Sequence, residues 1–271
     1  MPNCPTDLDQ SMLSCFQRCP RNFQWRYTRH LIPLEESLPL VFGTAWHKAL
    51  EAYYITYDTE RALEAFALEW GNREGEANRN LDVARRMLQA RAKQFKDDYI
   101  QVISRESTFA VDMGLFTLRG RRDGLCSIKG KGQVWVLEFK HSARAPNFNW
   151  LETYRPDNQL YAYVFATQQE FNCNGALVEY ALAHPSKANC HRGLIEVSNL
   201  EIADFVDSVK ATYDYMKERF RQNYFPMHPS ACSAYRGCEY RHLCTHPGMV
   251  EAISEAEFQI KPYNPPGVEV K

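Results

Sequence analysis

The sequence contains no hydrophobic segment of the kind that membrane insertion or secretion requires. None of its apolar runs approaches the roughly 20 residues of a membrane-spanning helix. The first residues, MPNCPTDLDQ, do not combine a basic stretch with an apolar one, which is the pattern of a secretory signal peptide. We therefore expect a cytoplasmic protein with no membrane partner, whose cysteines are reduced.

Repeats, low-complexity tracts and Gly/Ser-rich linkers are also missing. Their absence favours one compact domain over residues 1–271. Within it we expect a helical part (1–105), an α/β core (106–222) and a cysteine-rich segment (223–271). With 45% apolar residues, the chain is too hydrophobic to be disordered.

The chain has almost no net charge, with 32 Lys and Arg against 33 Asp and Glu. Taken alone, this balance argues against a nucleic-acid partner. The charges are uneven, however, because residues 18–30 carry four arginines and no acid among aromatic residues, and residues 119–131 are also basic. Such segments can bind phosphates and stack on unpaired bases, although exposed arginines are often only solvated.

Hydrophobic periodicity predicts the order of the secondary structure. Helical intervals recur in five segments, which cover residues 11–27 (with Ser11 as N-cap and a bend at Pro20), 44–67, 81–102, 157–170 and 200–222. Strand-like alternation or apolar runs occur in four segments, which cover residues 107–119, 122–128, 133–140 and 175–182. This order predicts an α/β sandwich around a mixed sheet.

Two carboxylates and a lysine lie near the ends of predicted strands. Asp123 lies in the segment RGRRDG, and Glu138 and Lys140 follow the apolar run VWVL. The two-residue period of a strand puts Glu138 and Lys140 on one sheet face. Glu-x-Lys alone is usually a solvated charge pair, but here it lies at the mouth of a buried strand. Carboxylates suit Mg²⁺, and a lysine beside a metal ion can orient or deprotonate an attacking water.

These motifs make the sequence resemble the PD-(D/E)xK nuclease superfamily, and within it the RecB-like and AddB-like exonuclease group. The family elements GxxDG, ExK, QxxxY and GxxxH correspond to Gly120–Gly124, Glu138–Lys140, Gln159–Tyr163 and Gly43–His47. The resemblance implies a single nuclease domain with a restriction-endonuclease-like core, in which helices flank a central mixed β-sheet.

The resemblance also implies roles for individual residues. Asp123 and Glu138 would bind Mg²⁺ or Mn²⁺ together with His47 and the backbone carbonyl of Phe139, and Lys140 would be the catalytic lysine. A local pair between His47 and Glu51, four residues apart on one helix face, is the competing explanation for the histidine.

Four further positions near these motifs have open roles. Gln159 and Tyr163 share a helix face and are expected to point at the site or at a substrate phosphate, although core packing of Tyr163 and a register with Tyr161 are alternatives. Glu106 precedes the first predicted strand, where the family often has an acid. Arg122 replaces the family's usual apolar residue before the aspartate, and it either faces DNA or alters the site.

The nine cysteines are many for this length, and their odd number argues against a disulfide framework. Cys232, Cys238 and Cys244 lie at two equal intervals in a polar segment, which is typical of metal ligands. The family resemblance suggests a [4Fe-4S] cluster that joins the two ends of the chain, with Cys19 as fourth ligand and Cys15 as the alternative.

Structural zinc remains an alternative to this cluster. Five residues separate the first two cysteines of the C-terminal group here, whereas two separate them in the usual family pattern. Three nearby histidines also suit zinc, namely His228, His242 and His246.

Together these observations predict a metal-dependent DNA nuclease, an exonuclease or an enzyme that processes single-stranded DNA or DNA ends in recombination or repair. The sequence lacks a GxxxxGK[ST] loop, so any unwinding would need a helicase or recombination partner. The alternatives are a non-catalytic, metal-stapled DNA-binding or complex-assembly module derived from such nucleases, and a zinc-stapled RNA-processing enzyme.

Overall fold

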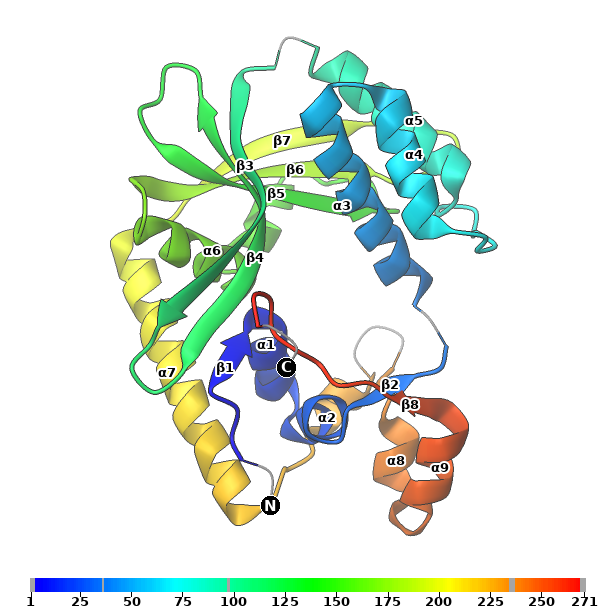
Figure 1. Ribbon diagram of the computed structural model, residues 1–271, viewed down its shortest axis with the longest axis vertical. Coiled ribbons are helices and arrows are strands. Elements are labelled where there is room, and N and C mark those ends of the chain that lie inside the picture. Colours follow the sequence, from blue (N-terminus) through cyan, green and yellow to red (C-terminus); the bar gives the residue numbers. More distant parts are fainter. Residues whose placement is uncertain (1–2, 36, 97, 234–236, 269–271) are drawn as a thin grey trace. The chain divides into compact units, whose positions relative to one another are not determined.

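The computed structural model describes residues 3–35, 37–96, 98–233 and 237–268 (Figure 1). The chain divides into two compact units. The unit that we call the central unit is formed by Ser37–Ser107 and Arg121–Ile202. The unit that we call the terminal unit is formed by Met1–Glu36, Thr108–Gly120 and Ala203–Lys271. Each is described below by itself.

The sheet of the central unit is mixed. It contains β3 (Ile100–Asp112) up to Ser107, β4 (Thr117–Ile128) from Arg121 on, and the strands β5 (Val134–Ser142), β6 (Cys173–Leu182) and β7 (Cys190–Glu196). They follow the order β3, β4, β5, β6, β7, in which β5 and β6 pair in parallel while β4–β5 and β6–β7 pair antiparallel. The predicted mixed sheet is therefore confirmed.

Helices cover both faces of this sheet. Trp135 and Phe139 of β5 are buried in a core that they share with α3 (Leu38–Thr56), α4 (Thr59–Trp70) and α5 (Leu81–Gln94). Side chains alternate along a strand, so Val136 and Glu138 point to the opposite face, and a further helix, α6 (Asn158–Gln168), packs against β5 and β6. Burial on both faces explains why the run VWVLEF is apolar almost throughout.

The terminal unit brings together segments from both ends of the chain. Near the N-terminus it contains β1 (Asp7–Asp9), α1 (Gln10–Arg18), α2 (Pro20–Phe23), the π-helix η1 (Gln24–Thr28) and β2 (Leu31–Pro33). From the C-terminal part it contains most of α7 (Asn199–Gln222), and also η3 (Pro229–Ser233), α8 (Arg241–Thr245), η4 (Pro247–Met249), α9 (Val250–Glu257) and β8 (Phe258–Ile260). Strand β2 pairs antiparallel with β8, and β1 pairs in parallel with the first residues of β4.

The predicted helices differ from the observed ones at their ends. Asp9 rather than Ser11 caps α1, because its Oδ1 accepts a hydrogen bond from the backbone N–H of Met12 at 2.8 Å. The helix predicted over 44–67 is two helices, since Tyr57 has a left-handed φ of 54° and Asp58 caps α4. The helix predicted over 81–102 ends at Gln94, and β3 begins soon after it.

The first predicted strand also lies elsewhere. The strands predicted over 107–119 and 122–128 require a turn between them, at Gly120, but the chain turns after β3 at Gly114, where φ is 89°. Gly120 lies inside β4. Only glycine fits there, because a Cβ atom at this position would be 2.4 Å from Cζ of Phe109. It is a site of close packing that resembled a turn in the sequence.

No helix in the described ranges combines the length and the apolar character that crossing a membrane requires. All nine cysteines lie in the described ranges, and none of them forms a disulfide.

Candidate active site

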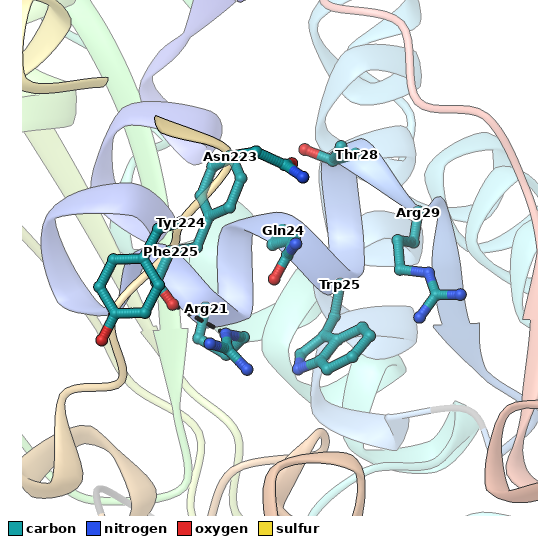
Figure 2. A pocket seen from close by; sticks show the side chains of 8 residues that line it. All are labelled: Arg21, Gln24, Trp25, Thr28, Arg29, Asn223, Tyr224 and Phe225. Carbon is teal, nitrogen blue, oxygen red and sulfur yellow. Dashed lines mark hydrogen bonds between the residues drawn. The ribbon is translucent and has the colours of Figure 1, made fainter. Parts of the chain in front are cut away.

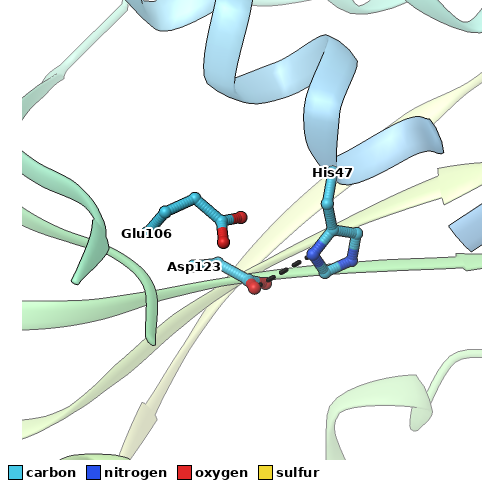
Figure 3. Close-up of side chains that lie close together, drawn as sticks. All are labelled: His47, Glu106 and Asp123. Atoms are coloured by element: carbon cyan, nitrogen blue, oxygen red, sulfur yellow. Dashed lines mark hydrogen bonds and ion pairs between the residues drawn. The ribbon is translucent and has the colours of Figure 1, made fainter. Parts of the chain in front are cut away.

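Three side chains from different elements of the central unit meet at one point (Figure 3). The imidazole Nδ1 of His47, on α3, lies 3.0 Å from Oδ1 of Asp123, on β4. A nitrogen of His47, a carboxylate oxygen of Asp123 and a carboxylate oxygen of Glu106, on β3, all lie within 4.8 Å of one another. The competing pair between His47 and Glu51 is not formed. His47 contacts Asp123 instead, and Glu51 accepts a hydrogen bond from Lys48 at 2.7 Å.

Asp123 also contacts the strand that carries the Glu-x-Lys motif. Its Oδ2 accepts a hydrogen bond from the backbone N–H of Phe139 at 2.8 Å. The N–H and C=O groups of one strand residue point to the same side, so the carbonyl of Phe139 faces the same edge of β5 as its N–H. This orientation agrees with the predicted use of that carbonyl as a ligand.

Glu106 is the residue whose role the sequence left open. It lies inside β3 and not before the first strand, and its φ of 45° is in the left-handed region that non-glycine residues rarely adopt. Strained backbone of this kind is concentrated at functional sites. Arg121 binds its Oε2 at 2.8 Å, which holds the carboxylate in place. No spacing in the sequence reveals this conformation.

Glu138 and Lys140 form a pair beside this group. Oε1 of Glu138 accepts a hydrogen bond from Nζ of Lys140 at 2.5 Å, and the Glu138 side chain is 1% exposed. Its Oε2 is buried and has no hydrogen-bond partner within the described part of the chain. A buried carboxylate oxygen without a partner is costly, and a cation would satisfy it.

The lysine continues into the predicted Gln-x-x-x-Tyr motif on α6. Lys140 donates to Oε1 of Gln159 at 3.0 Å, and Nε2 of Gln159 donates to the hydroxyl of Tyr163 at 3.1 Å. The alternative tyrosine points elsewhere, since the Tyr161 hydroxyl donates to Glu201 at 3.0 Å. The hydrogen-bond chain from Glu138 to Tyr163 therefore favours the register with Tyr163.

The charges of the site are crowded. Burial, strengthened by the charge of Asp123, raises the pKa of Glu138 to about 7, although Lys140 opposes the shift. Burial also raises the pKa of Glu106, against the effect of Arg121. Burial alone would lower the pKa of His47, but the carboxylate of Asp123 outweighs it and raises that pKa. Three carboxylates and an imidazole in one place form an acidic donor set that suits a hard divalent cation.

Arg122 is buried and is not available to contact DNA. Its side chain is 2% exposed, and it donates to Oγ1 of Thr167 at 3.0 Å and to Glu170 at 3.1 Å. Neighbouring residues of a strand point to opposite faces, so Arg122 is directed away from the face of Asp123. The departure from the family pattern is therefore a packing feature of α6 and β4, and the interpretation that Arg122 faces DNA is wrong.

The four cysteines assigned to a cluster all lie in the terminal unit. Burial raises the pKa of the Cys244 thiol, and the nearby thiols of Cys19 and Cys232 add to this effect. The pKa of Cys238 is raised in the same way, with Cys232 as a contributing neighbour. The alternative ligand Cys15 is buried and donates to Oδ1 of Asn22 at 3.0 Å.

Three of the four cysteines assigned to the cluster accept a hydrogen bond at their sulfur atom. The donors are the indole Nε1 of Trp25 to Cys244 at 3.4 Å, Nδ2 of Asn22 to Cys238 at 3.5 Å and the backbone N–H of His228 to Cys19 at 3.5 Å. The imidazoles of the nearby histidines have other contacts. That of His228 contacts the carbonyl of Arg18, that of His242 contacts Glu257, and that of His246 contacts Thr245.

A sequence profile of the PD-(D/E)XK nuclease superfamily matches residues 8–245, which is most of the chain. The chain therefore belongs to this superfamily, and the superfamily resemblance is confirmed. Membership supports a hydrolytic nuclease and agrees with the mixed sheet and with the acidic group of His47, Glu106 and Asp123. No curated protein matches the chain.

Solved structures agree at the level of the fold. A candidate exonuclease from Eubacterium rectale matches with a TM-score of 0.52 at 12% identity, over 80% of this chain and 82% of that protein. The match to an alkaline exonuclease from Laribacter hongkongensis covers 68% of this chain and 98% of that protein, at 13% identity. Its TM-score of 0.26 is too low to bear on the fold.

Proposed function

We propose that this chain is a Mg²⁺- or Mn²⁺-dependent DNA nuclease of the RecB-like and AddB-like group, an exonuclease that acts on DNA ends during recombination or repair. The observation that carries the proposal is the meeting of His47, Glu106 and Asp123 within 4.8 Å, beside the buried Glu138–Lys140 pair. A helicase or recombination protein would supply unwinding, and the cytoplasm would suit both the DNA substrate and reduced thiols.

In this proposal His47, Asp123 and Glu138 hold the ion together with the carbonyl of Phe139. Glu106 joins them, because its carboxylate lies within 4.8 Å of the first two. The donor set fits such an ion, since the buried Oε2 of Glu138 has no protein partner among the described residues. The bound ion would polarise the phosphate and make water more acidic.

The protein's own groups position the reactants. Lys140 has three N–H donors, and two of them are used by Glu138 and Gln159. The third is left to orient the attacking water or a phosphate oxygen. Gln159, held by Tyr163, keeps the ammonium group from rotating away.

Cleavage of end-labelled DNA tests this proposal. With Mn²⁺, wild-type protein should shorten the strand, and Lys140→Gln should lower the rate by roughly 10²- to 10³-fold. Lys93→Gln, which removes an exposed lysine on α5 outside the two basic segments, is the matched control and should cleave normally. If wild-type protein with Mn²⁺ shifts the DNA in a gel but never shortens the DNA, the protein is a binding module. Preferential cleavage of an RNA of the same sequence would favour the RNA-processing alternative.

We further propose a [4Fe-4S] cluster ligated by Cys19, Cys232, Cys238 and Cys244. The three hydrogen bonds to their sulfur atoms support it, because such bonds stabilise cluster sulfurs and tune the cluster. The nearby imidazoles already have other contacts, which favours a thiolate-only set over zinc with histidine.

Anaerobic purification followed by an absorption spectrum and iron, sulfide and zinc analysis tests the cluster. Brown protein with about four irons is expected. Cys238→Ser should lose iron, whereas Cys173→Ser, a buried thiol on β6, should retain it. A colourless protein with stoichiometric zinc would contradict the proposal.

A further inference from the structure

The terminal unit contains a pocket of about 520 Å³ that the nuclease motifs do not explain. Figure 2 shows its lining, which comes from α2, the π-helix η1 and the segment after α7. The lining residues are Arg21, Gln24, Trp25, Thr28, Arg29, Asn223, Tyr224 and Phe225. The sequence had indicated a basic and aromatic stretch over residues 18–30, and part of that stretch forms one wall.

The pocket is positively charged. Two of its lining residues are arginines and none is an acid. Arg21 donates through Nε to the carbonyl of Phe225 at 2.8 Å, and it forms no ion pair with any carboxylate that the structure describes. The acid near Arg29 is Glu251, at 3.9 Å, and both of these side chains are largely exposed, so the pair is weak. Both guanidinium groups thus keep donors for an anionic ligand.

One wall presents an aromatic ring to solvent. The Tyr224 side chain is 55% exposed and follows the end of α7. The N–H of Asn223 donates to the carbonyl of Phe220, and the N–H of Tyr224 donates to that of Arg219, which together form a Schellman motif. Asn223 has the left-handed φ of 49° that this motif needs. The helix end therefore fixes the backbone of Tyr224 at the pocket while leaving its ring uncovered.

The opposite wall is a helical turn of unusual width. Residues Gln24–Thr28 form a π-helix, a rare conformation that occurs frequently at functional sites. In Figure 2, Gln24 and Trp25 lie between the two arginines. The indole of Trp25 is under the guanidinium of Arg29, at 5.3 Å, and donates to the sulfur of Cys244. This wall is therefore anchored to the cysteine group.

From the two arginines and the exposed ring we infer that this pocket binds an unpaired DNA strand. Arg21 and Arg29 bind its phosphates, and one base stacks on Tyr224. A positively charged groove with an aromatic platform is the combination that binds single strands without sequence preference, and bases inside a duplex are not available for such stacking. The inference rests on the proposed function for its choice of DNA, and it adds a binding site that is separate from the catalytic residues.

Fluorescence anisotropy with a labelled oligo(dT) tests the site in the full-length protein. The titrations contain EDTA, so that binding is measured without cleavage. Tyr224→Ala should weaken binding about 5- to 100-fold, and Tyr224→Phe, which keeps the ring, should bind nearly as wild type does. Arg29→Gln should weaken binding and also reduce the slope of log K against log salt by about 0.7, the value for one phosphate contact on a single strand.

The matched control is Lys210→Gln, which removes an exposed charge on α7 and does not line the pocket. It should leave both affinity and salt slope unchanged. The inference would be overturned if Lys210→Gln and Arg29→Gln lost the same affinity for oligo(dT), or if Tyr224→Ala bound it as tightly as wild type does. Either result would overturn it even if the enzyme cleaves DNA. If Tyr224 and Arg29 behave as expected in a protein that never cleaves DNA, the pocket assignment stands and the nuclease proposal fails.

Discussion

Replacement of Glu179 tests how the central unit stabilises the neighbour of β5, the strand that carries the proposed catalytic motif. Glu179 lies on β6, opposite Phe139 of β5, and its side chain is 1% exposed. It accepts hydrogen bonds from Arg91 at 2.5 and 3.1 Å and from Arg192 at 2.8 Å. Arg192 also binds Asp98 at 2.6 and 3.0 Å, whereas no other carboxylate of the described chain binds Arg91.

Glu179→Gln would leave the buried guanidinium of Arg91 without a counter-charge. Removing one partner of a buried ion pair typically costs about 3–5 kcal/mol of unfolding free energy. With a urea m-value of about 2–3 kcal/mol/M, the urea midpoint should fall by roughly 1–2.5 M. The matched control is Glu218→Gln, because Glu218 pairs with Arg221 at the surface of α7, and it should change the midpoint little.

Tryptophan fluorescence during urea unfolding measures this loss, because Trp46 and Trp135 are buried in the core of the central unit. The effect should depend on pH. Burial alone would raise the pKa of Glu179, but Arg91 and Arg192 outweigh it and lower that pKa. The stabilisation is therefore complete above the unfolded pKa of about 4.3 and is lost as the pH falls through the lower folded pKa.

The difference between wild type and Glu179→Gln should accordingly be full at pH 7 and shrink below about pH 4. A midpoint shift no larger than that of Glu218→Gln would refute the reasoning. A difference that stays constant from pH 7 to pH 3 would refute it as well, because the carboxylate would then contribute no charge interaction.

Two further predictions concern packing and the hydrogen-bond chain of the site. Gly120→Val should cost about 1–3 kcal/mol, because the new side chain would overlap Phe109. Phe109→Ala in the same protein should restore part of this loss, because it removes the overlapping ring. The control Gly248→Val, where no atom lies within 4 Å of the new Cβ, should be nearly neutral in urea unfolding. Tyr163→Phe should lower kcat on labelled DNA by roughly 2- to 10-fold through the lost partner of Gln159, whereas Tyr161→Phe should leave it unchanged. Equal kcat losses in both tyrosine variants would contradict the assigned register.

The mixed sheet and its flanking helices were predictable because the apolar run of β5 has the composition of a strand buried on both faces. The ordered motifs also located Asp123, Glu138, Lys140 and Gln159, and the structure brings these side chains into neighbouring contacts. Their catalytic and ligand roles remain predictions.

Other features depend on tertiary contacts that leave no pattern in the sequence. Gly120 resembled a turn residue, but it is a packing site for Phe109. The basic character of Arg122 suggested a DNA contact, although the side chain is buried against α6. Glu106 reaches the site because it has a left-handed φ inside β3, and no pattern in the neighbouring sequence predicts this conformation.

Binding of Mn²⁺ to the wild-type protein, followed by electron paramagnetic resonance, tests the central claim most directly. We predict one Mn²⁺ site that Asp123→Ala weakens at least about 10-fold, since this change removes a proposed ligand next to His47 and Glu106. Lys140→Gln should retain the ion, because the lysine is not a ligand. Binding of Mn²⁺ to Asp123→Ala as tightly as to wild type would contradict the account.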